Sequence, residues 1–186
     1  MDLALKKSYR WINPYRISNQ FLRSQGFAQR DLYGETPLST LQQVALALKL
    51  TSEDHLFELG CGRGRGVFFL RCLYGCEVTG IDWHPTFISR AQKIAPLDTQ
   101  NRTHFTCSDF MQADLSQATV IYLYGTCLQD EEIHLFCQRL SECALLKYVA
   151  TVSFPLCDYD PLFKTLSVFS ASFPWGDADL FINARS

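Results

Sequence analysis

A glycine-rich segment in the first half of the chain carries the residue types best suited to binding a ligand. It reads ELGCGRGRG from Glu58 to Gly66 and follows an apolar stretch that begins at His55. Glycines between a strand and a helix permit a tight turn, and they let backbone N–H groups approach a ligand at the helix N-terminus. The carboxylate of Glu58 would repel a pyrophosphate and attract a cation. The segment therefore predicts a binding site for a ligand with positive charge.

Two more carboxylates follow later strand-like runs. Asp82 stands 20 residues beyond Gly62, where a carboxylate at a strand end can accept both hydroxyls of a ribose. Asp109 follows the run that ends at Cys107, and its structural alternative is the N-cap of a helix over residues 111–115. The carboxyl ends of parallel strands meet at one edge of a sheet. We therefore expect the three acidic positions to converge on one crevice.

The spacing of the glycines argues against a dinucleotide site, which requires G-x-G-x-x-G. A motif starting at Gly60 would need a glycine where Arg65 stands, and one starting at Gly62 would need a glycine where Val67 stands. Arg63 and Arg65 could clamp a phosphate, although we expect both to be exposed loop residues. They keep a nucleotide- or NAD-binding oxidoreductase as an alternative.

The elements that must position these residues alternate between strand-like and helix-like periodicity, which indicates a parallel sheet wrapped by helices. The expected strands are residues 55–59, 77–81, 103–107, 119–124 and 148–154, and the expected helices are residues 39–50, 67–74, 84–94 and 130–143. Two final strand-like runs, residues 165–173 and 178–184, flank a Pro-Trp-Gly-Asp turn. This arrangement predicts an antiparallel hairpin at the end of the sheet.

The spacing Glu58-x-Gly60-x-Gly62-x-Gly64 resembles motif I of the class I, seven-stranded S-adenosylmethionine-dependent methyltransferases. The resemblance covers roughly residues 36–184. It implies an α/β fold, a three-layer α/β/α Rossmann-like sandwich whose mostly parallel seven-stranded sheet ends in a C-terminal antiparallel hairpin. The cofactor would be S-adenosyl-L-methionine, the product S-adenosyl-L-homocysteine, and no metal would be needed. The implied cofactor-binding residues are Tyr33, Thr36, Glu58, Gly60, Cys61, Gly62, Gly64, Asp82, Trp83, Asp109, Phe110 and Tyr124.

Shorter similarities bear on the methyl acceptor. Residues 114–124 resemble the fourth-strand segment of small seven-strand protein lysine methyltransferases. Residues 33–37 (YGETP) resemble the stretch that covers the methionine part of the cofactor in that group and in the non-SET histone lysine methyltransferases. The chain departs from these families at Thr126, where they have a proline, and it lacks the Asn/Asp-Pro-Pro-Tyr motif of many amino methyltransferases. The resemblance implies transfer to a nitrogen or oxygen nucleophile, with a protein lysine as the narrower prediction.

Methyl transfer from a sulfonium is an in-line displacement, so a protein contributes mainly alignment and the exclusion of water. An amine acceptor must lose a proton before it attacks. The candidates to receive that proton or to orient the amine are Tyr33, Glu35, Tyr122 and Tyr124. We expect at most one of Tyr122 and Tyr124 to face the crevice. We expect the nearby Cys61 to pack and not to act as a nucleophile.

Composition narrows the class of partner. The 186 residues include 17 Lys and Arg against 19 Asp and Glu, a net charge of −2, which gives no strong signal for nucleic-acid binding. The first 30 residues are the exception, with six basic residues against Asp2. We expect residues 1–35 to form a basic, aromatic segment of short helices and loops that acts as a lid, and residues 36–186 to form the methyltransferase domain. We favour a protein over a small molecule as the acceptor.

The eight cysteines contain no C-x-x-C pair, and we expect them to be reduced and buried. No apolar run approaches the roughly 20 residues needed to cross a bilayer, and the start lacks the apolar stretch of a secretory signal. We therefore expect a soluble, cytoplasmic protein. A non-catalytic protein that keeps the fold as an interaction module is the second alternative.

Overall fold

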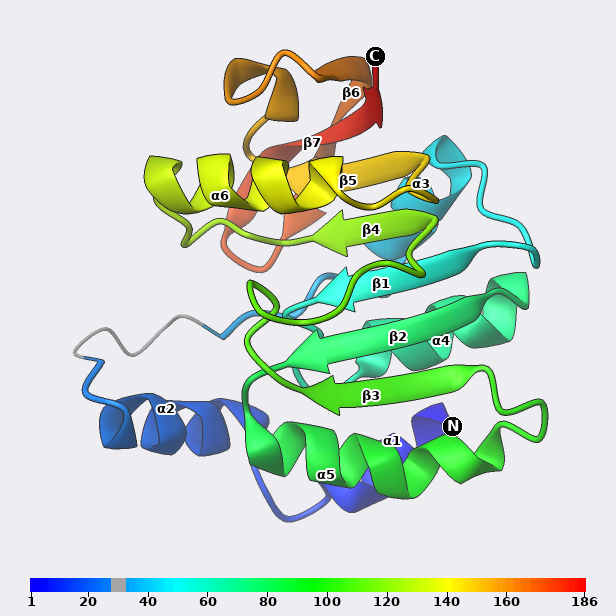
Figure 1. The fold of residues 1–186 in the computed structure, drawn as a ribbon. Helices are drawn as coiled ribbons and strands as arrows, with labels where there is room; N and C mark the ends of the chain where they lie inside the picture. The colour runs from blue at the N-terminus through cyan, green and yellow to red at the C-terminus, as the bar shows by residue number, and fades with distance from the viewer. Residues whose placement is uncertain (28–32) are drawn as a thin grey trace.

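The computed structural model describes residues 1–27 and 33–186 and contains one seven-stranded sheet flanked by helices (Figure 1). The strand order is β3-β2-β1-β4-β5-β7-β6. The first five strands pair in parallel, and β7 runs antiparallel to both of its neighbours. The predicted fold class is thereby confirmed. The strands are β1 (His55–Leu59), β2 (Glu77–Asp82), β3 (Thr103–Cys107), β4 (Val120–Leu123), β5 (Tyr148–Val152), β6 (Phe163–Phe173) and β7 (Gly176–Arg185).

The helices follow the predicted order, with shifts at their ends. They are α1 (Asp2–Ser8), α2 (Pro14–Ser24), α3 (Leu38–Ala47), α4 (Arg65–Tyr74), α5 (Pro85–Ile94) and α6 (Asp130–Ser141), with 3-10 turns at Ala95–Leu97 and Leu156–Asp158. The helix predicted over residues 39–50 ends earlier, because Lys49 adopts a left-handed conformation (φ 52°) that stops it. The predicted alternative of a helix over residues 111–115 was wrong, since that segment forms turns.

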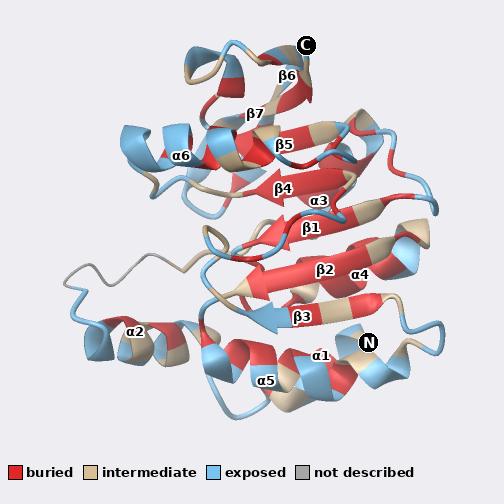
Figure 2. Ribbon diagram, in the orientation of Figure 1, coloured by how far each residue is buried: buried red, intermediate tan, exposed pale blue. Residues whose placement is uncertain are grey.

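Two hydrophobic cores lie on opposite faces of the sheet. Successive residues of β4 alternate between them: Val120 and Tyr122 belong to the larger core and Ile121 to the smaller. Helices α1, α3, α4 and α5 contribute buried side chains to the larger core, and α6 contributes to the smaller one. Strands β1, β2, β4 and β5 are therefore largely buried, whereas the carboxyl end of β3, at the edge of the sheet, is exposed (Figure 2). Strand β6 also has many exposed positions.

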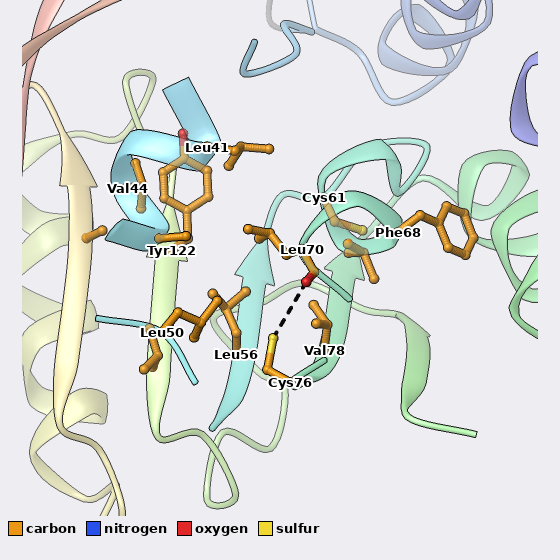
Figure 3. Packing of buried hydrophobic residues seen from close by; sticks show 14 of the residues in the cluster. Leu41, Val44, Leu50, Leu56, Cys61, Phe68, Leu70, Cys76, Val78 and Tyr122 are labelled. Carbon is orange, nitrogen blue, oxygen red and sulfur yellow. Dashed lines mark hydrogen bonds between the residues drawn. The ribbon is translucent and has the colours of Figure 1, made fainter. Parts of the chain in front are cut away.

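The larger core also fixes the orientation of Tyr122. Its ring lies beside Leu41 and Val44 of α3, as Figure 3 shows, and the residue is 1% exposed. This packing holds the carboxyl end of β4 against α3, next to the carboxyl end of β1.

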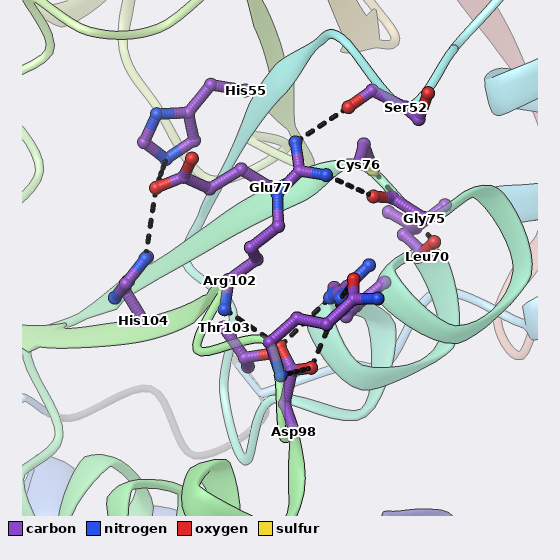
Figure 4. Close-up of polar contacts among 12 residues, drawn as sticks. Ser52, His55, Leu70, Gly75, Cys76, Glu77, Asp98, Arg102, Thr103 and His104 are labelled. Carbon is purple, nitrogen blue, oxygen red and sulfur yellow. Dashed lines mark hydrogen bonds and ion pairs between the residues drawn. The ribbon is translucent and has the colours of Figure 1, made fainter.

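Polar contacts join residues around the amino ends of β2 and β3 (Figure 4). These contacts lie at the end of the sheet away from the carboxyl ends of the parallel strands. Arg71 of α4 donates to the Asp98 carboxylate at 2.9 Å, and both side chains are 7% exposed. Arg102 donates to two backbone carbonyls there, and His104 pairs with Glu77 at 3.0 Å. These contacts tie the segment before β3 to the helix that covers β2.

All eight cysteines are free, but Cys72, Cys107, Cys127 and Cys157 are exposed, so the prediction that the cysteines are buried was wrong for half of them. Apolar neighbours in sequence do not bury a residue that lies on the outer face of a helix or past a strand end. Among the described residues, no helix is both long and apolar enough to cross a membrane.

Candidate functional site

The glycine-rich segment forms a turn at the carboxyl end of β1. Gly60, Gly62 and Gly64 all have positive φ (74°, 55° and 79°), a conformation that strains residues with a side chain. The N–H groups of Gly60 and Cys61 donate to the carbonyl of Ile81, which anchors the turn to the end of β2. The chain then enters α4 directly, so that the N-terminus of this helix faces the turn.

Glu58 is a buried carboxylate beside this turn. It is 7% exposed, and its Oε2 atom has no hydrogen-bond partner within residues 1–27 and 33–186. A Cβ atom on Gly66 would come within 2.5 Å of the carboxylate, so a glycine at that position makes room for it. Burial raises the pKa of Glu58 to about 8, and the negative charges of Glu35 and Asp82 add to this effect.

A small recess, with a cavity volume of about 20 Å³, lies above Glu58. It opens between the carboxyl ends of β1 and β4, where the strand order reverses direction, which is the position at which open α/β sheets bind ligands. Seven of the twelve predicted cofactor-binding residues line it, together with Glu35 and Tyr122. The lining consists of Tyr33, Gly34, Glu35, Thr36, Glu58, Leu59, Gly60, Cys61, Gly62, Arg65, Gly66, Tyr122 and Tyr124.

The segment before α3 closes one side of the recess. The Tyr33 ring lies over Gly62, where an added Cβ atom would be 2.8 Å from its Cε2 atom. The Tyr33 hydroxyl donates to Glu35, and Arg63 binds the same carboxylate through Nε and Nη2. Arg63 has a side-chain exposure of 17%, so the expectation that it is an exposed loop residue was wrong. The reason is its ion pair with a residue 28 positions earlier, which local sequence does not reveal.

Tyr122 and Tyr124 both line the recess, so the expectation that at most one would face it was wrong. Residues two apart on a strand point to the same side. The Tyr122 and Thr36 hydroxyls hydrogen-bond at 2.7 Å, which ties the segment before α3 to β4. Burial raises the pKa of both Tyr122 and Tyr33 well above the ordinary range. Both hydroxyls therefore stay protonated at neutral pH and can orient a ligand or acceptor as hydrogen-bonding groups.

Asp82 and Trp83 lie beside the recess and do not line it. The Asp82 carboxylate accepts from the N–H groups of Gly62 (2.7 Å) and His84 (2.8 Å), so it braces the glycine turn. Burial raises its pKa. Trp83 is 42% exposed and packs edge-on against Phe21 of α2.

Asp109 and Phe110 lie outside the recess. Asp109 is exposed and accepts from the N–H of Met111 at 2.9 Å, which caps a turn. Phe110 packs edge-on against Phe136 in the smaller core. The Ser108 N–H donates to the carbonyl of Asp82 at 3.1 Å, so the start of this loop lies beside the carboxyl end of β2. The cofactor contacts predicted for Asp109 and Phe110 remain predictions.

Two aromatic residues near the recess were not predicted as site residues from the sequence. The ring of Tyr15 in α2 meets the ring of Tyr33 edge-on, with the ring centroids 5.2 Å apart. Trp175, in the turn between β6 and β7, donates from its indole nitrogen to the Tyr124 hydroxyl. Nothing in the spacing of either residue marks it, because its position depends on how distant elements pack.

Comparisons with known proteins agree with this geometry. Residues 56–144 match the family described as Methyltransferase domain. An RNA methyltransferase from Salinibacter ruber, solved with S-adenosyl-L-homocysteine, aligns with a TM-score of 0.65 and 23% identity over 80% of this chain and 91% of that one. Magnesium protoporphyrin IX methyltransferase (ChlM) from Synechocystis PCC 6803, with bound SAM, has a TM-score of 0.65 and 17% identity over 94% and 98% of the two chains.

TrmN from Thermus thermophilus aligns with a TM-score of 0.67 and 16% identity, over 84% of this chain and 51% of that one. The search of curated proteins finds no match. The described part of the chain holds no cluster of three or more His, Cys, Asp or Glu side chains arranged to bind a metal.

Proposed function

We propose that the chain, in which residues 56–144 match a methyltransferase domain and the sheet has the seven-stranded Rossmann-like order, transfers a methyl group from S-adenosylmethionine to a nitrogen or oxygen nucleophile. The observation that carries the proposal is the Glu58 carboxylate. It is buried beneath the recess with one oxygen unpartnered among the described residues. An unpaired buried carboxylate is costly, and a cationic ligand would remove that cost.

The residues present fit this cofactor. Glu58 would attract its ammonium and sulfonium charges, and Gly60 and Gly62 add no side chains of their own to the recess. Asp82 would hold the ribose hydroxyls, because each of its oxygens accepts only one backbone hydrogen bond and can accept another. Tyr33 and Thr36 would cover the cofactor from the segment before α3.

When bound, the cofactor would supply a methyl group carried on a sulfonium, and the acceptor would lose a proton as it takes up that group. The protein contributes alignment and a site that excludes water. Tyr122 and Tyr124 present hydroxyls toward the recess and can orient the acceptor atom. The Glu35 carboxylate is held by Arg63, so this ion pair must loosen before Glu35 can accept a proton.

The acceptor is a separate question. The structural neighbours carry different names, an RNA methyltransferase and a porphyrin methyltransferase, so they support the shared cofactor and not one acceptor. The narrower prediction of a protein lysine stays a prediction. To test this prediction, a cell lysate is incubated with labelled S-adenosylmethionine and then separated into protein, nucleic-acid and small-molecule fractions.

The two alternatives make different predictions. An oxidoreductase would need to place a pyrophosphate at the glycine turn, beside the buried Glu58 carboxylate, which is electrostatically unfavourable. Calorimetric binding of NAD(P) without binding of S-adenosylmethionine would support it. An interaction module that has lost catalysis would bind neither form of the methyl-donor cofactor.

The test of the proposed function is calorimetric binding of S-adenosylhomocysteine to three proteins. We expect wild type to bind, Asp82→Ala to lose binding at least tenfold, and Glu131→Ala to bind as wild type does. Glu131 is an exposed acid on α6 and serves as the matched control. Circular dichroism of each variant separates a lost contact from a lost fold. Absence of binding by folded wild type would overturn the proposal.

A further inference from the structure

A stripe of basic and amide side chains runs along α2 next to the recess. It consists of Arg16, Asn19, Gln20 and Arg23, spaced three and four residues apart, and thus on one face of the helix. These four residues, with Asn13 and Tyr15, line a surface hollow. We call the four residues the basic stripe. Figure 1 places α2 on the side of the sheet toward which the parallel strands point.

The charges of the basic stripe are available to a partner. Arg16 and Arg23 are exposed, and neither has a carboxylate oxygen within 4.0 Å among residues 1–27 and 33–186. They stand seven residues apart, about 10 Å along the helix. Two exposed guanidinium groups at this separation suit a chain of anionic groups better than one small anion.

The basic stripe leads to the recess through Tyr15. This residue precedes Arg16 on α2 and is 47% exposed. Its ring meets Tyr33 edge-on with centroids 5.2 Å apart, and Tyr33 lines the recess. A polymer bound along the stripe would therefore reach the mouth of the recess.

A second aromatic residue stands at this mouth, on the hairpin of β6 and β7. The last residue pair between β5 and β7 is Val152 with Leu180, so the hairpin turn extends four residues, roughly 13 Å, past the end of β5. There Trp175 is 54% exposed, stacks on Phe173 and donates to the Tyr124 hydroxyl. The exposed part of the Trp175 side chain is available to a ligand.

We propose that this surface binds single-stranded nucleic acid, with phosphates on the basic stripe and an unpaired base at Tyr15, Tyr124 and Trp175. Arginines pair with phosphates, and aromatic rings stack on bases of any sequence. A basic or neutral peptide finds no complementary charge on the stripe. The proposal rests on the proposed function, because the bound strand would present its acceptor atom to the recess. The overall net charge of −2 does not oppose it, since the positive charge is local.

Fluorescence anisotropy with labelled 20-nucleotide RNA and DNA strands of mixed sequence tests the phosphate contacts. We expect wild type to bind and Arg16→Gln/Arg23→Gln to bind about tenfold more weakly, with a log–log salt slope smaller by about 1.4. The matched control, Lys93→Gln/Lys164→Gln, removes two exposed charges on α5 and β6 and should bind as wild type does. The ratio of RNA to DNA affinity identifies the preferred strand.

Trp175→Ala tests the stacking contact. We expect about tenfold weaker binding with an unchanged salt slope, because stacking releases no counterions. An equal loss of affinity in Lys93→Gln/Lys164→Gln would show that the charges act non-specifically, and it would overturn the proposed surface.

Calorimetry with S-adenosylhomocysteine on the same variants separates the two proposals. If wild type binds this ligand but neither oligonucleotide, the surface proposal fails and the methyltransferase proposal stands. If the oligonucleotides bind through the basic stripe but S-adenosylhomocysteine does not bind, the methyltransferase proposal fails and the surface proposal stands. Label from S-adenosylmethionine that appears only in lysate protein would also overturn the surface proposal.

Discussion

At the scale of single residues, Glu58 explains the most about the site. It is the penultimate residue of β1, and its carboxylate is buried and lacks a partner for Oε2 in the described structure. Its pKa is raised to about 8, chiefly by burial. A raised pKa means that the folded protein holds this proton more tightly than the unfolded chain does. The free energy of unfolding of the ligand-free protein should therefore fall as the pH rises from about 4.5 toward 8.

We predict that Glu58→Gln stabilises the ligand-free protein and weakens the cofactor site. At pH 8 the free energy of unfolding should exceed that of wild type by roughly 2 kcal/mol or more, because the amide carries no charge to bury. At pH 5 the two proteins should be similar. Urea unfolding at both pH values measures this. A higher free energy of unfolding for wild type than for Glu58→Gln at pH 8 would contradict the prediction, because it would show that the Glu58 carboxylate stabilises the fold.

The same residue predicts a pH dependence of ligand binding. S-adenosylhomocysteine should bind more tightly as the pH rises from 6 to 7.5, because its ammonium favours the ionised form of Glu58 and binding then releases a proton. Calorimetry in buffers of different ionisation enthalpy detects that proton. In Glu58→Gln the affinity should drop at least tenfold and lose this pH dependence.

At the scale of elements, the turn after β1 and the polar contacts around the amino ends of β2 and β3 have different roles. The turn shapes the recess, whereas Arg71 and Asp98 join α4 to the segment before β3. Their ion pair is buried and charge-assisted, so breaking it leaves one charge unpaired. The hydrogen bonds from Arg71 hold the pKa of Asp98 well below its usual range.

We predict that Asp98→Asn lowers the free energy of unfolding by about 3 kcal/mol at pH 7. The stabilisation from Asp98 is present above the pKa of an unfolded aspartate, about 4, and is lost as the pH falls through the lower folded value. The difference between wild type and Asp98→Asn should therefore shrink as the pH decreases below 4. Urea unfolding at pH 7, 4 and 3 tests this, with the exposed Asp179→Asn as control. A difference independent of pH would contradict the ion-pair explanation.

At the scale of the whole molecule, the recess joins segments that are far apart in the chain. Residues 33–36 close it from one side, the β1 turn forms its floor, and β4 forms the far wall. A ligand bound among these segments must stabilise the folded state as a unit. It would link the segment before α3, where Tyr33 contacts Tyr15 at the start of α2, to the sheet.

We predict that S-adenosylhomocysteine at 100 times its dissociation constant stabilises the protein by about 2.7 kcal/mol. For a domain of this size the melting temperature should rise by roughly 5–10 °C. Differential scanning fluorimetry measures the shift, and NAD at the same concentration should produce none. A shift with NAD alone would favour the oxidoreductase.

How much could be predicted from sequence differs between the fold and the site. The alternation of strands and helices, the final hairpin and the glycine turn are local patterns, and each is present in the structure. Asp82 beside the turn also follows from its place at a strand end. Arg63 was misjudged because its partner Glu35 lies outside any local pattern. The place of Asp109 outside the recess depends on the path of a loop without regular structure.

The sequence by itself determined the sheet class and the position of the glycine turn, because backbone periodicity and glycine conformation are properties of short segments. Only the tertiary structure decided which side chains surround that turn. The pairing of Arg63 with Glu35 and the approach of Trp175 to Tyr124 both arise when elements far apart in the chain pack together. Such contacts depend on register, helix placement and the overhang of a hairpin, and no spacing within one segment records them.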